Sequence, residues 1–213
     1  DTTFATDRFN MPLMIGTMVD GTIIAFFALL SAETIDEFDW VFTQFKKCFE
    51  EEPRNIITDE SLSFEATIKA HFINSFHAIF SWHKSNSIKR NLSSKGCLRE
   101  KNGKLFKYYS LTLAIKDPEE KAQYEQLLTD IQNLPFCLSK SDVETVFLRI
   151  YKDPFLSGIQ YFKDLEQDVD RWSAAYRKDR FMLRARTTQR AERTNRNLKS
   201  KVTSQISLNE LLI

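Results

Sequence analysis

Residues 11–30 run MPLMIGTMVDGTIIAFFALL, two apolar stretches separated by Asp20-Gly21. Asp-Gly between apolar stretches predicts a β-hairpin, because both central positions of a two-residue turn require a positive φ that these residues tolerate. The second stretch, from Ile23 to Leu30, is far too short to span a bilayer and predicts a strand buried on both faces. An antiparallel strand pair therefore begins the predicted fold.

A helix signal and a strand signal follow the hairpin. Thr34 and Glu37 form a capping box, in which each side chain bonds the backbone N–H of the other residue. Beyond this start, apolar residues recur at helical spacing: Phe38, Val41, Phe42, Phe45 and Phe49. Residues Asn55 to Thr58 are rich in β-branched side chains and predict a short strand that ends at Asp59.

A second helix and strand are expected after Asp59. Phe64, Ile68 and Phe72 share one helix face, and the stretch from Ser75 to Trp82 predicts another strand. Helices alternating with strands are typical of a sheet covered by helices. Residues 1–83 are therefore expected to form an α/β unit, a mixed sheet flanked by helices.

Residues 84–178 are expected to form an all-helical insertion. Residues 84–104 are polar and basic, which is typical of a loop or a frayed helix. Three helices are predicted beyond them: one starting at Asp117-Pro118, one at Ser141 with Glu144, and one from Phe162 to Tyr176.

Residues 179–213 are expected to hold a last helix, from Thr188 to Val202, and a tail. Spacing of i, i+3, i+4 and i+7 places four polar residues on one face of this helix: Glu192, Asn195, Arg196 and Lys199. Between Arg171 and Lys201 there are eleven Lys or Arg against two acids, although the net charge of the chain is only +1. A cationic segment of this kind is suited to phosphates, and a solvated helix face is the alternative interpretation.

Composition indicates a globular domain in a reducing compartment. The chain is 42% apolar with 18 Phe, and it has only five Gly and five Pro, which argues for long regular elements and against disorder. Cys48, Cys97 and Cys137 match no metal-ligand spacing, and no signal peptide opens the sequence. We therefore expect free thiols and an intracellular location.

Three acidic residues are candidates for a metal site: Asp1, Asp59 and Glu192. Asp59 directly follows a predicted strand, and ligand sites in α/β sheets gather at strand ends. A carboxylate from a helix packed on the sheet, such as Glu192, would let several acids converge on Mg²⁺, which prefers oxygen ligands. The ordinary alternatives are a turn or helix-capping role for Asp59 and an ion-pair role for Glu192.

Five sequence blocks carry a resemblance to a known family. They are Asp1-Thr-Thr-Phe-Ala-Thr with Asn10-Met-Pro-Leu, Ala28-Leu-Leu-Ser-Ala-Glu-Thr, Ile56-Ile-Thr-Asp-Glu, Phe80-Ser-Trp-His83 with Asn91-Leu, and Thr187-Thr-Gln-Arg-Ala-Glu-Arg-Thr-Asn195. In this order they resemble Mutator-like element (MULE) transposase domains, which include transcription factors of the far-red-impaired-response type.

The resemblance implies a DDE-type catalytic domain with an RNase H-like fold and a helical insertion before its last catalytic helix. Asp1, Asp59 and Glu192 would be the catalytic residues and would ligate two Mg²⁺ or Mn²⁺ ions. Phe80 stands where the family has a cysteine, and His83 is kept as a secondary candidate. Because Asp1 is the first residue, we expect part of the strand that presents it to lie upstream of this sequence.

Duplex DNA is the partner that the resemblance implies, as transposon ends and target, with a possible homo-oligomer and a nuclear location. The residues expected to contact phosphates are Arg190, Arg193, Arg196 and Lys199. Trp82 and Trp172 are predicted to be core aromatics. A domesticated, DNA-binding transcriptional regulator is the alternative function, and a generic RNase H-like nuclease fits the last block less well.

Overall fold

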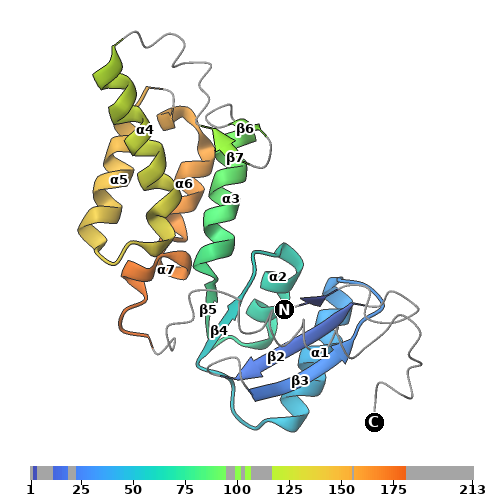
Figure 1. The fold of residues 1–213 in the computed structure, drawn as a ribbon. Helices are drawn as coiled ribbons and strands as arrows, with labels where there is room; N and C mark the ends of the chain where they lie inside the picture. Colours follow the sequence, from blue (N-terminus) through green and yellow to red (C-terminus); the bar gives the residue numbers. More distant parts are fainter. Residues whose placement is uncertain are drawn as a thin grey trace. The chain divides into compact units, whose positions relative to one another are not determined.

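The computed structural model describes residues 2–3, 12–18, 23–94, 99–101, 104–106, 117–154 and 156–180. They form a mixed α/β structure with two compact units, one within residues 1–80 and one over Ser81–Arg180 (Figure 1). The α/β class expected from the sequence is confirmed at this level. The predicted domain boundaries at residues 83 and 178 stay predictions.

The first unit begins with an antiparallel sheet. Strands β1 (Thr2–Thr3), β2 (Leu13–Met18) and β3 (Ile23–Leu29) pair in the order β1-β2-β3. The predicted hairpin is therefore confirmed in its two strands, whereas its Asp20-Gly21 turn lies outside the described residues.

The prediction that residues 23–30 are buried on both faces is wrong. Phe26 and Ala28 pack against the core of the unit, and Leu30 is part of that core. Alternate residues of a strand point to opposite faces, so Phe27 points away from the core, and its side chain is 55% exposed. One face of β3 thus packs against the core through partly buried side chains, and the opposite face is exposed at Phe27.

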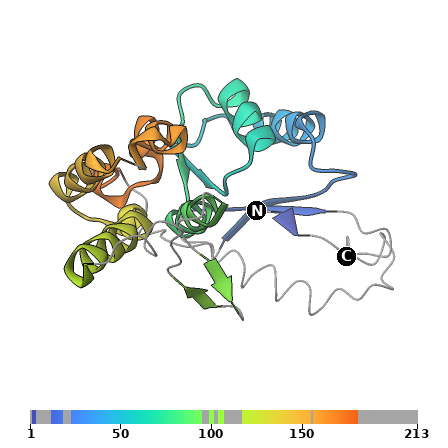
Figure 2. The ribbon, with the colours of Figure 1, turned by 90° about the horizontal axis from the view of Figure 1, so that it is seen from above.

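Helix α1 (Ile35–Cys48) begins as predicted. The Thr34 side chain accepts a hydrogen bond from the Glu37 N–H at 3.4 Å, which confirms this half of the capping box. Helix α2 (Leu62–His71) follows later in the unit, and Figure 2 shows α1 and α2 on the same side of the β2–β3 hairpin.

The core of the first unit joins the hairpin to both helices. Its buried members are Met14, Leu30, Phe38, Val41, Phe42, Phe64, Ile68 and Phe72. Aromatic rings meet edge to face in it, with centroids 4.7 Å apart for Phe38 and Phe64 and 5.0 Å apart for Phe42 and Phe72. Such contacts stabilise the packing beyond the area that they bury.

Strands β4 (Asn55–Thr58) and β5 (Phe76–Ile79) form a parallel pair, in which Ile56 is opposite His77 and Thr58 is opposite Ile79. The strand predicted over residues 75–82 is therefore too long. Because β4 ends at Thr58, the last interstrand bond is donated by the Phe80 N–H to the Thr58 carbonyl oxygen, at 3.0 Å.

The second unit begins with helix α3 (Ser81–Ser94), so Trp82 belongs to a helix. Its side chain is 46% exposed, and its prediction as a core residue is wrong. Trp172 is buried as predicted, and its indole Nε1–H donates to the Leu165 carbonyl oxygen at 3.0 Å.

The insertion is not all-helical, which corrects the prediction for residues 84–178. Strands β6 (Arg99–Lys101) and β7 (Lys104–Phe106) form an antiparallel pair after α3. The sequence carried the signal for this hairpin, because Asn102-Gly103 stands between the strands and is a preferred dipeptide for two-residue turns.

The rest of the second unit is helical. It contains α4 (Pro118–Asn133), η1 (Leu134–Phe136), α5 (Lys140–Lys152), η2 (Leu156–Gly158), α6 (Gln160–Gln167), α7 (Val169–Trp172) and η3 (Ala174–Tyr176). The N-cap of α4 is Asp117, as predicted, whereas α5 is capped by Ser139 and begins before Ser141. The helix predicted from Phe162 to Tyr176 is broken at Asp168, where φ is −102° and ψ is 17°.

Arg177 ties the end of the second unit to its beginning. Its Nη2 donates to the Ser81 hydroxyl at 2.6 Å and to the Trp172 carbonyl oxygen at 3.0 Å, and its Nε donates to the Ser173 carbonyl oxygen at 3.3 Å. The residue is only 7% exposed, and burial lowers its pKa to about 10. The hydrogen bonds offset the cost of burying this cation.

Replacing Gly16 by alanine should destabilise the first unit. Gly16 is opposite Phe26 across β2 and β3, and a Cβ added at Gly16 would lie 2.1 Å from a ring carbon of Phe26. We expect Gly16→Ala to cost about 1–3 kcal/mol in the free energy of unfolding, measured by urea denaturation. Gly158→Ala is the control, because its added Cβ meets no atom within 4 Å. Equal midpoints for the two variants would contradict the packing described for Gly16.

Replacing Arg177 by methionine should loosen the second unit. The change removes the hydrogen bonds that the buried cation donates to Ser81, Trp172 and Ser173, and a hydrogen bond to a charged group contributes about 1.5–3 kcal/mol. We expect faster amide hydrogen exchange over residues 169–177 in Arg177→Met, and no change in Lys178→Met, since Lys178 is exposed. Unchanged exchange in Arg177→Met would show that the buried arginine does not hold the unit closed.

Candidate functional site

Asp59 lies directly after β4, at the carboxyl end of a strand of the parallel pair, as the sequence predicted. Its residue is half-buried, and its Oδ1 atom is shielded from solvent. Glu60, the next residue, is exposed. Asp59 therefore presents a hard oxygen donor at a fixed strand end, which is a suitable position for a divalent cation.

A buried polar pair adjoins Asp59. The Thr58 hydroxyl donates to the Asp59 carbonyl oxygen at 2.8 Å, and it lies 2.7 Å from Nε2 of His77. Thr58 and His77 are each 8% exposed. No sequence motif indicated a role for His77. The available signal was a polar residue in a short strand beside Ala78 and Ile79, because a buried polar side chain requires a hydrogen-bond partner.

The other predicted ligands and the predicted DNA contacts lie outside the described residues: Asp1, Glu192, Arg190, Arg193, Arg196 and Lys199. Within the part of the chain that the structure describes, no three His, Cys, Asp or Glu residues cluster closely enough to hold a metal ion. The three-acid site and its roles stay predictions.

His83 and Phe80, the two remaining residues of interest, have different surroundings. His83 lies in α3 of the second unit, half-buried, with its ring edge-on to Trp82 at a centroid distance of 4.8 Å. Phe80 ends the first unit and supplies its backbone N–H to Thr58. Any residue except proline can donate that bond, so it does not depend on the side chain at position 80.

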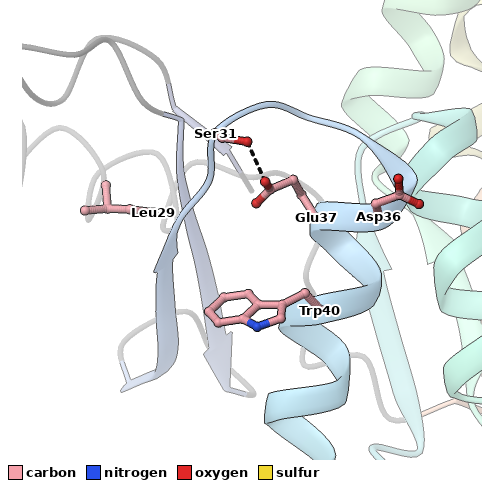
Figure 3. A pocket seen from close by; sticks show the side chains of 5 residues that line it. All are labelled: Leu29, Ser31, Asp36, Glu37 and Trp40. Atoms are coloured by element: carbon pink, nitrogen blue, oxygen red, sulfur yellow. Dashed lines mark hydrogen bonds between the residues drawn. The ribbon is translucent and has the colours of Figure 1, made fainter.

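A surface cleft of about 480 Å³ lies between the end of β3 and the start of α1. Figure 3 shows the side chains that line it, which are Leu29, Ser31, Asp36, Glu37 and Trp40. The Ser31 hydroxyl donates to the Glu37 carboxylate across the cleft mouth. Asp59 does not line this cleft, and two acids beside apolar side chains are ill suited to phosphate, so the cleft is not part of the candidate site.

A second cleft of about 340 Å³ lies within the helical unit. Asp130 and Arg149 form an ion pair on its wall, and Cys137 also lines it. Burial, followed by the nearby carboxylates of Asp142 and Asp130, raises the pKa of the Cys137 thiol. The thiol is therefore a weak nucleophile, and this cleft adds no chemistry to the candidate site.

Comparison with known proteins supports the resemblance over the first part of the chain. Residues 1–87 match the family model of the MULE transposase domain, and no curated protein matches the chain. The resemblance predicted from the sequence is thus confirmed over the range that contains both Asp1 and Asp59. Among the described helices, none has the length and apolar character needed to cross a membrane.

Residues 1–87 are therefore similar to the MULE transposase domain, and this similarity suggests a transposase-related function and an interaction with DNA.

Proposed function

We propose that this chain, whose residues 1–87 match the MULE transposase domain, is the catalytic domain of a DDE-type transposase with an RNase H-like fold. The observation that carries the proposal is the position of Asp59 at the carboxyl end of β4, with Oδ1 shielded from solvent. The antiparallel β1–β3 sheet, the parallel β4–β5 pair and the covering helices are compatible with that fold.

Asp1, Asp59 and Glu192 are the proposed ligands for Mg²⁺ or Mn²⁺. Carboxylates suit these cations, and a strand end holds its side chain more rigidly than a loop does. When bound, a pair of such ions activates the attacking oxygen and stabilises the leaving oxygen of a phosphoryl transfer. The role of the three acids is to hold the two metal ions at fixed positions.

The proposed reaction has two steps on DNA. A water oxygen attacks a phosphodiester at the transposon end, and the 3′-oxygen leaves as a free hydroxyl. That hydroxyl then attacks a phosphodiester of the target, whose own 3′-oxygen leaves. Four cations would hold the backbone in place without reading its sequence: Arg190, Arg193, Arg196 and Lys199. We expect this chemistry in a nucleus, in a homo-oligomer that joins two ends.

A domesticated regulator is the second candidate function. Phe80 occupies the position at which the family has a cysteine, and this departure favours a copy that binds DNA without cutting it. The two candidate functions share a fold and a DNA partner. The transposase cleaves a DNA strand, whereas the regulator binds DNA without cleaving it.

Strand cleavage should depend on two carboxylates. In a nicking assay of the 213-residue chain on supercoiled DNA with Mn²⁺, we expect Asp59→Asn and Glu192→Gln each to lower the rate by about 100-fold or more, because each removes a charged ligand of the reacting centre. Glu60→Gln is the control, because Glu60 is exposed beside Asp59 and has no proposed role. Equal rates for all variants would contradict the proposal, and DNA binding without any nicking by the wild type would favour the regulator.

DNA affinity should depend on the cations around Glu192. Replacing Arg190, Arg193, Arg196 and Lys199 together by Gln should weaken binding and make log K fall less steeply with log salt, by about 0.9 for each lost phosphate contact. The control removes the same charge from exposed residues outside the segment from Arg171 to Lys201: Lys47, Lys121, Lys152 and Lys163. The proposed contacts would be refuted if both quadruple variants showed the same salt dependence, measured by fluorescence anisotropy.

A further inference from the structure

Asp59 lies one residue beyond the last residue of β4 that pairs with β5. Interstrand bonds fix the direction of each residue in a strand, but the β4–β5 ladder ends at Thr58, one residue before Asp59. A carboxylate that serves as a ligand must be held in one direction, because a displacement of about 1 Å weakens a site severely. Something other than the ladder has to orient Asp59.

We infer that Thr58 and His77 are the positioning residues that orient Asp59, an inference that rests on the proposed function of Asp59. The peptide before Asp59 is held by the Phe80 N–H, which donates to the Thr58 carbonyl oxygen at 3.0 Å. The peptide after Asp59 is held by the Thr58 hydroxyl, which donates to the Asp59 carbonyl oxygen at 2.8 Å. With both flanking peptides held, φ and ψ of Asp59 are fixed, and its side chain leaves the backbone in one direction.

His77 completes the arrangement. A threonine hydroxyl has one proton, and here that proton points to the Asp59 carbonyl oxygen. The contact of 2.7 Å between the hydroxyl and Nε2 of His77 is therefore a bond that His77 donates, which places a ring proton on Nε2. The chain of donation runs from His77 to Thr58 and from Thr58 to the peptide that follows Asp59.

The sheet register and burial make this chain rigid. Opposite residues of parallel strands point to the same face, so Ile56, His77, Thr58 and Ile79 share one face, with His77 diagonal to Thr58. Thr58 and His77 are each 8% exposed, so water does not compete well for the hydroxyl. A buried hydrogen bond of this kind also strengthens its neighbour in the chain.

The test is the affinity of the 213-residue chain for Mn²⁺ alone, measured by isothermal titration calorimetry. Thr58→Val keeps the shape of the side chain but removes the hydroxyl, and we expect it to weaken Mn²⁺ binding by about 10–100-fold, the usual effect of losing a partner that orients a ligand. Thr58→Ser keeps the hydroxyl and should restore the affinity to within about threefold of the wild type, the low end of that effect. His77→Leu should behave as Thr58→Val does.

A matched control separates positioning from loss of stability. Thr67 in α2 is also buried, and its hydroxyl donates to the Ser63 carbonyl oxygen at 2.8 Å. Thr67→Val should lower the urea midpoint as Thr58→Val does while leaving Mn²⁺ affinity unchanged. If Thr58→Val fails to fold, the comparison of His77→Leu with the wild type decides the matter.

Asp59→Ala distinguishes the inference from the function on which it rests. Loss of Mn²⁺ binding in Asp59→Ala with wild-type affinity in Thr58→Val and His77→Leu would overturn the inference and leave the proposed function standing. Wild-type Mn²⁺ affinity in Asp59→Ala would overturn both. Weak binding in Thr58→Val with recovery in Thr58→Ser would support the positioning role.

Discussion

The parallel pairing of β4 with β5 is the constraint on which the candidate site depends. It ends with the bond from the Phe80 N–H to the Thr58 carbonyl oxygen, and that end point decides where Asp59 leaves the sheet. The hydrophobic core of the hairpin, α1 and α2 supports this strand pair, because Ile56 of β4 packs against that core. Beyond that bond, the buried Thr58 hydroxyl donates to the carbonyl oxygen of Asp59, one residue past the last paired residue of β4.

Much of the first unit could be predicted because its local signals agree with its packing. The hairpin, the capping box at Thr34 and the strand before Asp59 all follow from residues that are close together in the sequence. The errors arise where a partner far along the chain decides the outcome. Strand β5 ends because β4 has no paired residue after Thr58. Helix α3 follows it, and Trp82 is exposed on that helix.

The helical unit shows the same division. Helix starts with a capping side chain, such as Asp117, were predictable, whereas at the break no proline is present and the Asp168 side chain makes no capping hydrogen bond. The β6–β7 pair was missed because each strand has only three residues and β6 is entirely charged, although Asn102-Gly103 stands between them. In the candidate site, Asp59 was found from its strand and its motif, and the contact between His77 and Thr58 depends on a register that no local pattern gives.

The two ends of the sequence differ in charge. Residues 1–80 carry thirteen acids against five Lys or Arg, and an acidic surface repels a phosphate backbone. Under the proposed function, the cations between Arg171 and Lys201 offset that repulsion. In the proposed function, Glu192 lies within that cationic segment and joins it to the metal site.

A crystal structure of the chain with Mn²⁺, using anomalous scattering, would show whether Asp59 and Glu192 share one metal site. We expect an anomalous peak at the carboxylate of Asp59, with the carboxylate of Glu192 within about 8 Å of it, the distance that two ions about 4 Å apart can bridge. A peak elsewhere, or carboxylates too far apart for a shared site, would contradict it.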